Sequence, residues 1–123
     1  MIDAHLARDG KLSYMQIPAD DVEVSAAFYA ATFGWSLGGS PAHRSFADAS
    51  GELIGAFITG RAISREAGIL PYVYVDGLNA ALERVVSNGG EIVAPASSEG
   101  DLRVATARDP AGNLIGLWQA GGR

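Results

Sequence analysis

An internal repeat constrains the fold of this chain more than any other feature of its sequence. Residues 48–57 (DASGELIGAF) match residues 109–118 (DPAGNLIGLW) at five of ten positions, and Phe57 and Trp118 form a sixth, conservative pair. A repeat of this kind, placed near the end of each half of the chain, predicts a duplicated supersecondary unit.

Each half is predicted to contain a strand, a helix and three further strands. Apolar residues from Val22 to Phe33 recur at helical spacing, and the same spacing between a capping aspartate and a terminating glycine recurs in the second half. The expected strands are residues 11–17, 35–37, 43–47, 52–59, 70–75, 91–94, 102–107 and 113–118, and the expected helices run from Asp20 or Asp21 to Gly34 and from Asp76 to Gly89 and Gly90.

Two such units predict an α+β fold, with a single domain over residues 1–123 built from one βαβββ module at 11–59 and another at 69–119. The modules are expected to form a curved, mixed sheet around a cleft, with the helices on the outer face. Strand alternation then assigns side chains to the cleft. The residues predicted to bind a ligand are Tyr14, Gln16, Gly55, Phe57, Leu70, Tyr72, Tyr74, Arg103, Gly116 and Trp118.

These side chains have structural interpretations as well. Strand tyrosines and tryptophans also pack in cores and dimer interfaces, and Gly55 and Gly116 suit a close backbone approach as well as space for a ligand. Arg103 suits either a bidentate bond to an anionic ligand or a surface ion pair. The loop acids Glu99 and Asp101 are candidates for a catalytic base.

Composition excludes several classes of site and partner. The chain has no cysteine, which removes disulfides, thiolate metal sites and cysteine nucleophiles. Its net charge of −5 argues against a nucleic-acid partner, because binding to a phosphate backbone requires a basic face. There is no apolar run of ~18 residues and no secretory pattern at the N-terminus, so no membrane partner is expected and the predicted location is the cytoplasm.

Several segments together resemble the vicinal oxygen chelate superfamily, which includes glyoxalase I, bleomycin-resistance proteins and extradiol dioxygenases. They are IPADD at 17–21, FYAATFGW at 28–35, NGG at 88–90, Arg103 and DPAGNLIGLW at 109–118. The resemblance covers residues 11–119 and is closest to small bacterial glyoxalase-like proteins. It implies a homodimer, in which Trp35 is a candidate contact residue besides its simpler role in the core.

Enzymes of this superfamily hold a divalent metal with His, Glu or Gln from four strand positions, and the metal polarises two neighbouring oxygens of the substrate. The resemblance carries these positions to Tyr14, Gly55 or its neighbour Ala56, Leu70 and Gly116. Three of the four have no donor side chain, so no metal and no other cofactor is expected. Residues left for an altered site are Gln16, His43 and Glu52; the other histidine, His5, precedes the first strand.

The preferred hypothesis is a protein that binds a small aromatic or amphipathic molecule in a metal-free cleft, as bleomycin-resistance proteins do. The alternative is a metal-independent lyase, isomerase or hydroxylase-like enzyme of small-molecule metabolism. Its acid–base or electrostatic groups would be Tyr14, Gln16, Tyr72 or Arg103. A third hypothesis is a dimeric interaction partner of another protein.

Overall fold

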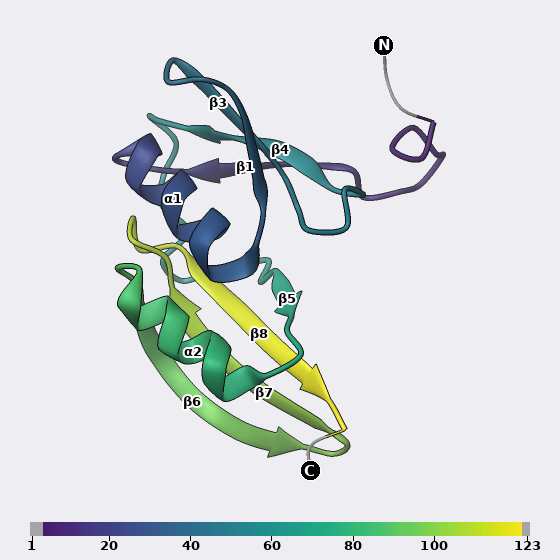
Figure 1. The fold of residues 1–123 in the computed structure, drawn as a ribbon, viewed down its shortest axis with the longest axis vertical. Coiled ribbons are helices and arrows are strands. Elements are labelled where there is room, and N and C mark those ends of the chain that lie inside the picture. Colours follow the sequence, from purple (N-terminus) through teal and green to yellow (C-terminus); the bar gives the residue numbers. More distant parts are fainter. Residues whose placement is uncertain (1–3, 122–123) are drawn as a thin grey trace. The chain divides into compact units, whose positions relative to one another are not determined.

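The chain folds into two compact units that repeat one arrangement of a strand, a helix and three strands (Figure 1). A computed structural model describes residues 4–121; unit 1 ends at Arg61 and unit 2 begins at Ala62. Each unit has a four-stranded sheet of its own. The predicted α+β class and the two βαβββ modules are confirmed.

Unit 1 pairs its first strand with its last. Its elements are β1 (Tyr14–Pro18), α1 (Val22–Phe33), β2 (Ser36–Ser40), β3 (His43–Ala47) and β4 (Ile54–Ile58). The sheet order is β1-β4-β3-β2, in which β1 runs parallel to β4 and the other pairs are antiparallel. A parallel pair needs a long crossover between its strands, and α1 lies in that crossover.

Unit 2 has the same topology. Its elements are β5 (Tyr72–Tyr74), α2 (Leu78–Ser87), β6 (Glu91–Glu99), β7 (Leu102–Arg108) and β8 (Leu114–Ala120). The order is β5-β8-β7-β6, with β5 parallel to β8. The edge strand β6 is longer than predicted and changes register with β7 twice, between Ile92 and Ala94 and between Ala94 and Ser97. Such irregularities keep an exposed edge from pairing with another chain.

The first helix begins and ends as the sequence predicts. The side chain of Asp21 accepts a hydrogen bond from the N–H of Val24 at 3.3 Å, which satisfies one of the free donors of the first turn. Gly34 ends the helix with φ +73°, and its N–H donates to the carbonyl oxygen of Ala30 at 3.0 Å. Glycine adopts this left-handed conformation without the steric cost that a Cβ imposes.

The expected cap of the second helix is wrong. Gly77, not Asp76, is the N-cap residue, and it offers no side-chain acceptor. The N–H of Leu78 donates instead to Oε1 of Gln119 on β8, at 2.8 Å. A residue 41 positions away therefore satisfies the first turn of α2. A local sequence pattern does not reveal such a partner.

The core of unit 1 is a set of aromatic rings between α1 and the sheet. Tyr29 stacks on Trp35 with the ring centroids 4.7 Å apart, and Trp35 stacks on Phe46 at 4.8 Å. Phe57 completes the cluster, 5.8 Å from Tyr29 and 5.2 Å from Phe46. Because Trp35 is only 8% exposed, its expected role in the core is confirmed.

In unit 2, α2 packs its apolar side against β7 and β8. The buried residues are Leu78, Ala81, Leu82 and Val85 on the helix and Ala105, Ala107, Ile115 and Leu117 on the strands. Successive strand side chains alternate, so the residues between these strand positions point to the other side of the sheet. We call the side of each sheet that faces away from its helix the open face. Within residues 4–121, neither helix is long and apolar enough to cross a bilayer.

Candidate functional site

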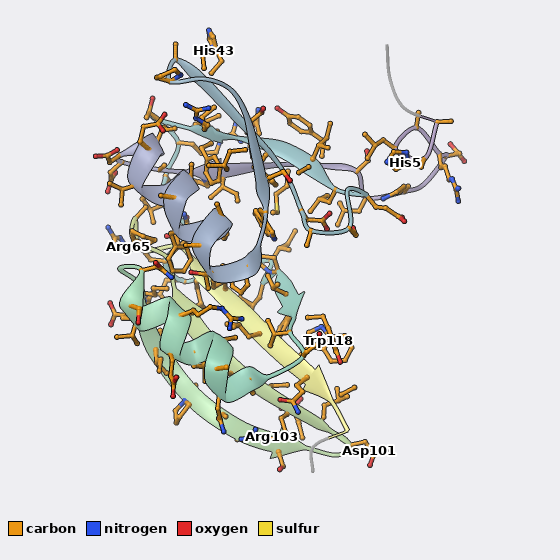
Figure 2. The ribbon with its side chains drawn as sticks, viewed as in Figure 1. His5, His43, Arg65, Asp101, Arg103 and Trp118 are labelled. Atoms are coloured by element: carbon orange, nitrogen blue, oxygen red, sulfur yellow. The ribbon has the colours of Figure 1, made fainter. Side chains whose placement is uncertain are left out.

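The open face of unit 2 carries three aromatic side chains. Residues directly opposite each other on neighbouring strands share a face, and Tyr72 pairs with Gly116 while Tyr74 pairs with Trp118. Leu117, which lies between the two β8 residues, is buried under α2. Trp118 and both tyrosines therefore lie on the open face, as predicted, and Figure 2 shows Trp118 next to the end of β5. We call Tyr72, Tyr74, Gly116 and Trp118 the aromatic face.

Each of these three rings has a close neighbour on the sheet. The rings of Tyr74 and Trp118 meet edge to face, with centroids 4.8 Å apart and planes at 79°. The ring of Tyr72 lies across Gly116, so closely that a Cβ on this glycine would be 2.5 Å from two ring carbons. Both tyrosines remain 48% exposed, which leaves a large part of each ring available to a ligand.

Small side chains continue the open face beside the rings. Thr106 and Val104 on β7 pair with Gly116 and Trp118, and Ala94 on β6 pairs with Thr106. Thr106 and Val104 are half-buried. A flat molecule that lies on this low surface would meet aromatic rings at one side and a hydroxyl group at Thr106. This combination of apolar contact with a few polar groups is typical of small-molecule sites.

The open face of unit 1 carries a hydrogen bond between two polar side chains that the sequence did not indicate. Tyr14 and Gln16 pair with Ile54 and Ala56 and lie on this face, as expected. The side-chain oxygen of Gln16 accepts a hydrogen bond from Nη1 of Arg61 at 2.6 Å. An arginine directly after the turn that ends β4 was the only available signal.

The prediction that Gly55 and Phe57 face the ligand is wrong. Phe57 is buried against Tyr29 of α1, and Gly55 lies under the ring of Phe46 on the same side of the sheet. Leu70 also differs from its prediction, because it is half-buried but precedes β5 rather than belonging to it.

A difference in loop length explains the exchange of faces. In unit 1, the N–H of Asp48 donates to the carbonyl oxygen of Leu53, and four residues lie between them. In unit 2, the N–H of Asp109 donates to the carbonyl oxygen of Asn113, and only three residues lie between them. Residues that match in the sequence repeat therefore occupy positions that differ by one residue in the two sheets. The structural equivalent of Gly116 is Ala56, not Gly55. A shift of one residue moves every following side chain to the other face.

Arg103 does not belong to the aromatic face. It pairs with Gln119, whose side chain caps α2, so Arg103 points to the helix side of its sheet. There it lines an open groove with Asn79 and Glu83, and Figure 2 shows it below α2. The expectation that Arg103 shares a face with Tyr72 and Trp118 is therefore wrong.

Each of the remaining polar candidates has its own surroundings within its unit. A ring nitrogen of His5 is 3.0 Å from the carbonyl oxygen of Gly51, and His43 is exposed at the start of β3. Glu52 accepts from Lys11 only through its backbone oxygen, at 2.6 Å. Glu99 ends β6 opposite Leu102, and Asp101 is exposed in the turn that follows.

The residues at the four family metal positions do not fit a divalent metal. Gly116 has no side chain, and the ring of Tyr72 fills the space in which a ligating side chain would stand. Gly55 faces the helix side, where Phe46 covers it, and its neighbour Ala56 is aliphatic. Leu70 has no donor. Among residues 4–121, no three histidines or carboxylates gather closely enough to hold a metal ion.

Comparison with known proteins agrees with this fold. The family model of the Glyoxalase/Bleomycin resistance protein/Dioxygenase superfamily matches residues 11–117. A protein of Mycobacterium bovis, named "Putative glyoxylase CFP32", is 31% identical over an alignment that covers 92% of this chain and 47% of that protein. The chain thus spans about half the length of this curated relative.

Solved structures share the fold at low sequence identity. A glyoxalase/bleomycin resistance protein/dioxygenase family enzyme from Burkholderia phytofirmans PsJN matches with a TM-score of 0.75 and 18% identity, over 90% of this chain and 99% of that one. TnmS3, an antibiotic binding protein from Streptomyces sp. CB03234, matches with a TM-score of 0.70 and 22% identity, over 90% and 96%. Since the family model spans almost the whole chain, this protein belongs to the Glyoxalase/Bleomycin resistance protein/Dioxygenase superfamily.

Proposed function

We propose that this protein binds a small aromatic or amphipathic molecule on its aromatic face, without a metal ion. The observation that carries this proposal is the grouping of Tyr72, Tyr74 and Trp118 on a sheet face that no helix of unit 2 covers. Aromatic rings in such a group offer a large apolar area that is already ordered. A planar ligand would gain stacking contacts there while displacing water from three rings at once.

Two further observations support the proposal. The residues at the family metal positions do not fit a metal, so binding would depend on contact area and hydrogen bonds rather than on chelation. The same fold also occurs in TnmS3, which is named an antibiotic binding protein. The proposed ligand class, a small molecule with a flat apolar body, agrees with that use of the fold.

Replacement of Trp118 by alanine tests the proposal with 2-naphthol, a neutral planar probe. We expect the unmodified protein to bind 2-naphthol and the variant to bind it roughly tenfold more weakly, because an aromatic contact contributes about 0.5–1.5 kcal/mol beyond its buried area. Binding is measured from amide chemical shifts in a two-dimensional NMR titration. The probe is recovered afterwards, since an altered product would favour the enzymatic alternative over binding.

Val86→Ala is the matched control for this measurement. Val86 is apolar and 56% exposed, but it lies on α2, away from the aromatic face. We expect its affinity for 2-naphthol to equal that of the unmodified protein. Equal losses in the Trp118 and Val86 variants, or no loss in either, would contradict binding at the aromatic face.

We also propose that the protein forms a homodimer, as the family resemblance implies. Among the described residues, Ile69 and Leu12 are apolar side chains, 90% and 78% exposed, that a partner chain would cover. Sedimentation equilibrium is expected to give twice the mass of the 12.7 kDa chain. A single species with the mass of one chain would refute the dimer.

A further inference from the structure

The geometry of unit 1 points to a binding site for an oxyanion at Arg61. The proposed ligand is an amphipathic anion, a carboxylate or a phosphate ester with an apolar body. This inference rests on the proposed function, small-molecule binding by this protein. It adds that the open face of unit 1 selects a ligand with a negatively charged group. It is independent of the aromatic rings of unit 2.

The backbone brings Arg61 back over the open face of unit 1. β4 ends at Ile58, and Gly60 then turns the chain with φ +86°. Arg61 lies three residues beyond the strand, yet its guanidinium bonds to Gln16, which pairs with Ala56 inside the sheet. The side chain of Arg61 is exposed, and its guanidinium lies beside Gln16 of β1.

The charge of Arg61 is not neutralised by any described carboxylate. The ion pair described in unit 1 joins Arg44 to Glu23 and does not include Arg61. The described hydrogen bond of Arg61 goes to an uncharged amide oxygen. A glutamine positions a guanidinium and leaves its positive charge unpaired, whereas a glutamate at residue 16 would cancel it.

The surroundings of Arg61 suit the apolar part of such a ligand. Ile54, Ala56 and Ile58 are half-buried on this face, and the ring of Tyr14 is 53% exposed beside Ile54. A guanidinium has five N–H donors in a planar fork, and Gln16 occupies one of them. The others are available for bidentate bonds to two oxygens of one ligand group, which lysine cannot provide.

A comparison of two probes tests the inference. We expect 2-naphthoate to bind to the unmodified protein and to shift the side-chain Nε–H signal of Arg61 in NMR spectra, which 2-naphthol does not shift. In Arg61→Gln, the affinity for 2-naphthoate should fall roughly fivefold, as expected for a charge pair exposed to solvent, with no change for 2-naphthol. Inorganic phosphate, which lacks an apolar body, should bind at least tenfold more weakly than 2-naphthoate.

Two further variants separate a built site from general charge attraction. Gln16→Glu keeps the size of the side chain and its bond to Arg61 but neutralises the guanidinium, so it should lose naphthoate binding as Arg61→Gln does. Arg8→Gln removes one positive charge from an exposed position in the same unit and should change nothing. An equal loss in Arg8→Gln, or full binding in Gln16→Glu, would overturn the oxyanion site.

The two proposals fail in different ways. If the affinity for 2-naphthol depends on Trp118 but the affinity for 2-naphthoate does not change in Arg61→Gln, the proposed function stands and the oxyanion site is refuted. If 2-naphthoate binds through Arg61 but 2-naphthol does not bind, the aromatic face is refuted as the ligand site. Binding of inorganic phosphate as tight as that of 2-naphthoate would overturn the requirement for an apolar body.

Discussion

Asp109→Ala is expected to lower the free energy of unfolding by about 3 to 5 kcal/mol. Asp109 is 3% exposed, and its Oδ1 accepts the N–H groups of Ala111, Gly112 and Asn113 at 3.1, 3.0 and 2.9 Å. All three donors belong to buried residues. Removal of the carboxylate leaves the N–H groups of Ala111 and Asn113 without this acceptor, while that of Gly112 keeps the backbone oxygen of Asp109 at 2.9 Å. A buried donor without a partner costs about 1–3 kcal/mol.

The loss should extend beyond the turn itself. The amide of Asn113 donates to the other oxygen of Asp109 at 2.9 Å, and its own oxygen accepts from the N–H of Ser64 at 2.8 Å. Asp109 therefore orients Asn113, which holds the first segment of unit 2 through Ser64. Urea unfolding followed by circular dichroism measures the change, and the midpoint of thermal unfolding should fall by about 10 °C.

The repeat supplies a matched control in Asp48→Ala. Asp48 occupies the corresponding turn of unit 1 and accepts from Ser50 and from the N–H of Gly51 at 2.7 and 2.9 Å. It is only half-buried, so water can replace the lost carboxylate, and we expect a loss of about 1 kcal/mol. If both variants lose the same stability, burial is not what makes the Asp109 turn important.

Gly55→Ala is expected to destabilise unit 1 by about 3 kcal/mol, at the upper end of the range for overpacking. A Cβ on Gly55 would overlap the carbonyl oxygen of Met15 on the neighbouring strand and would lie 2.5 Å from the ring of Phe46. The carbonyl is backbone in the middle of the β1–β4 pair, so it can move only if the ladder itself shifts. Urea unfolding measures the loss.

Gly116→Ala is the matched variant in unit 2, with a different expected result. The group that its Cβ would meet is the ring of Tyr72, an exposed side chain that can rotate away. We expect a loss of about 1 kcal/mol or less, together with severalfold weaker binding of 2-naphthol, because Tyr72 leaves its place on the aromatic face. Stability losses of equal size in the Gly55 and Gly116 variants would contradict this distinction between backbone and side-chain neighbours.

Local patterns in the sequence predicted the elements well. The spacing from Asp21 to Gly34 marks α1 because a cap and a terminator act within one turn of the residues they satisfy. The alternation in residues 72–74 and 114–118 placed Tyr72, Tyr74 and Trp118 on one face for the same reason. Strand periodicity is a local property and can be read without the tertiary structure.

Contacts between distant residues could not be predicted in this way. Gln119 caps α2 from another strand, and Arg61 reaches Gln16 across 45 positions, so neither partner shows in a sequence window. The assignment of Gly55 and Phe57 failed for another reason. Because the two copies of the repeat share residues, we expected matching residues to lie on the same face of each sheet. One additional residue in the loop after Asp48 moves the following side chains of unit 1 to the opposite face.

That single additional residue has a consequence for how the two halves can evolve. A recombination event that copied residues 109–118 over residues 48–57 would conserve the length and five of the ten residues. If the loop of unit 1 kept its longer form, the transferred tryptophan would take the position of Phe57 in the core, and the leucine before it would face outward. Exchange between the halves would therefore damage the recipient, and the two copies of an ancestral gene segment could specialise without being made uniform again.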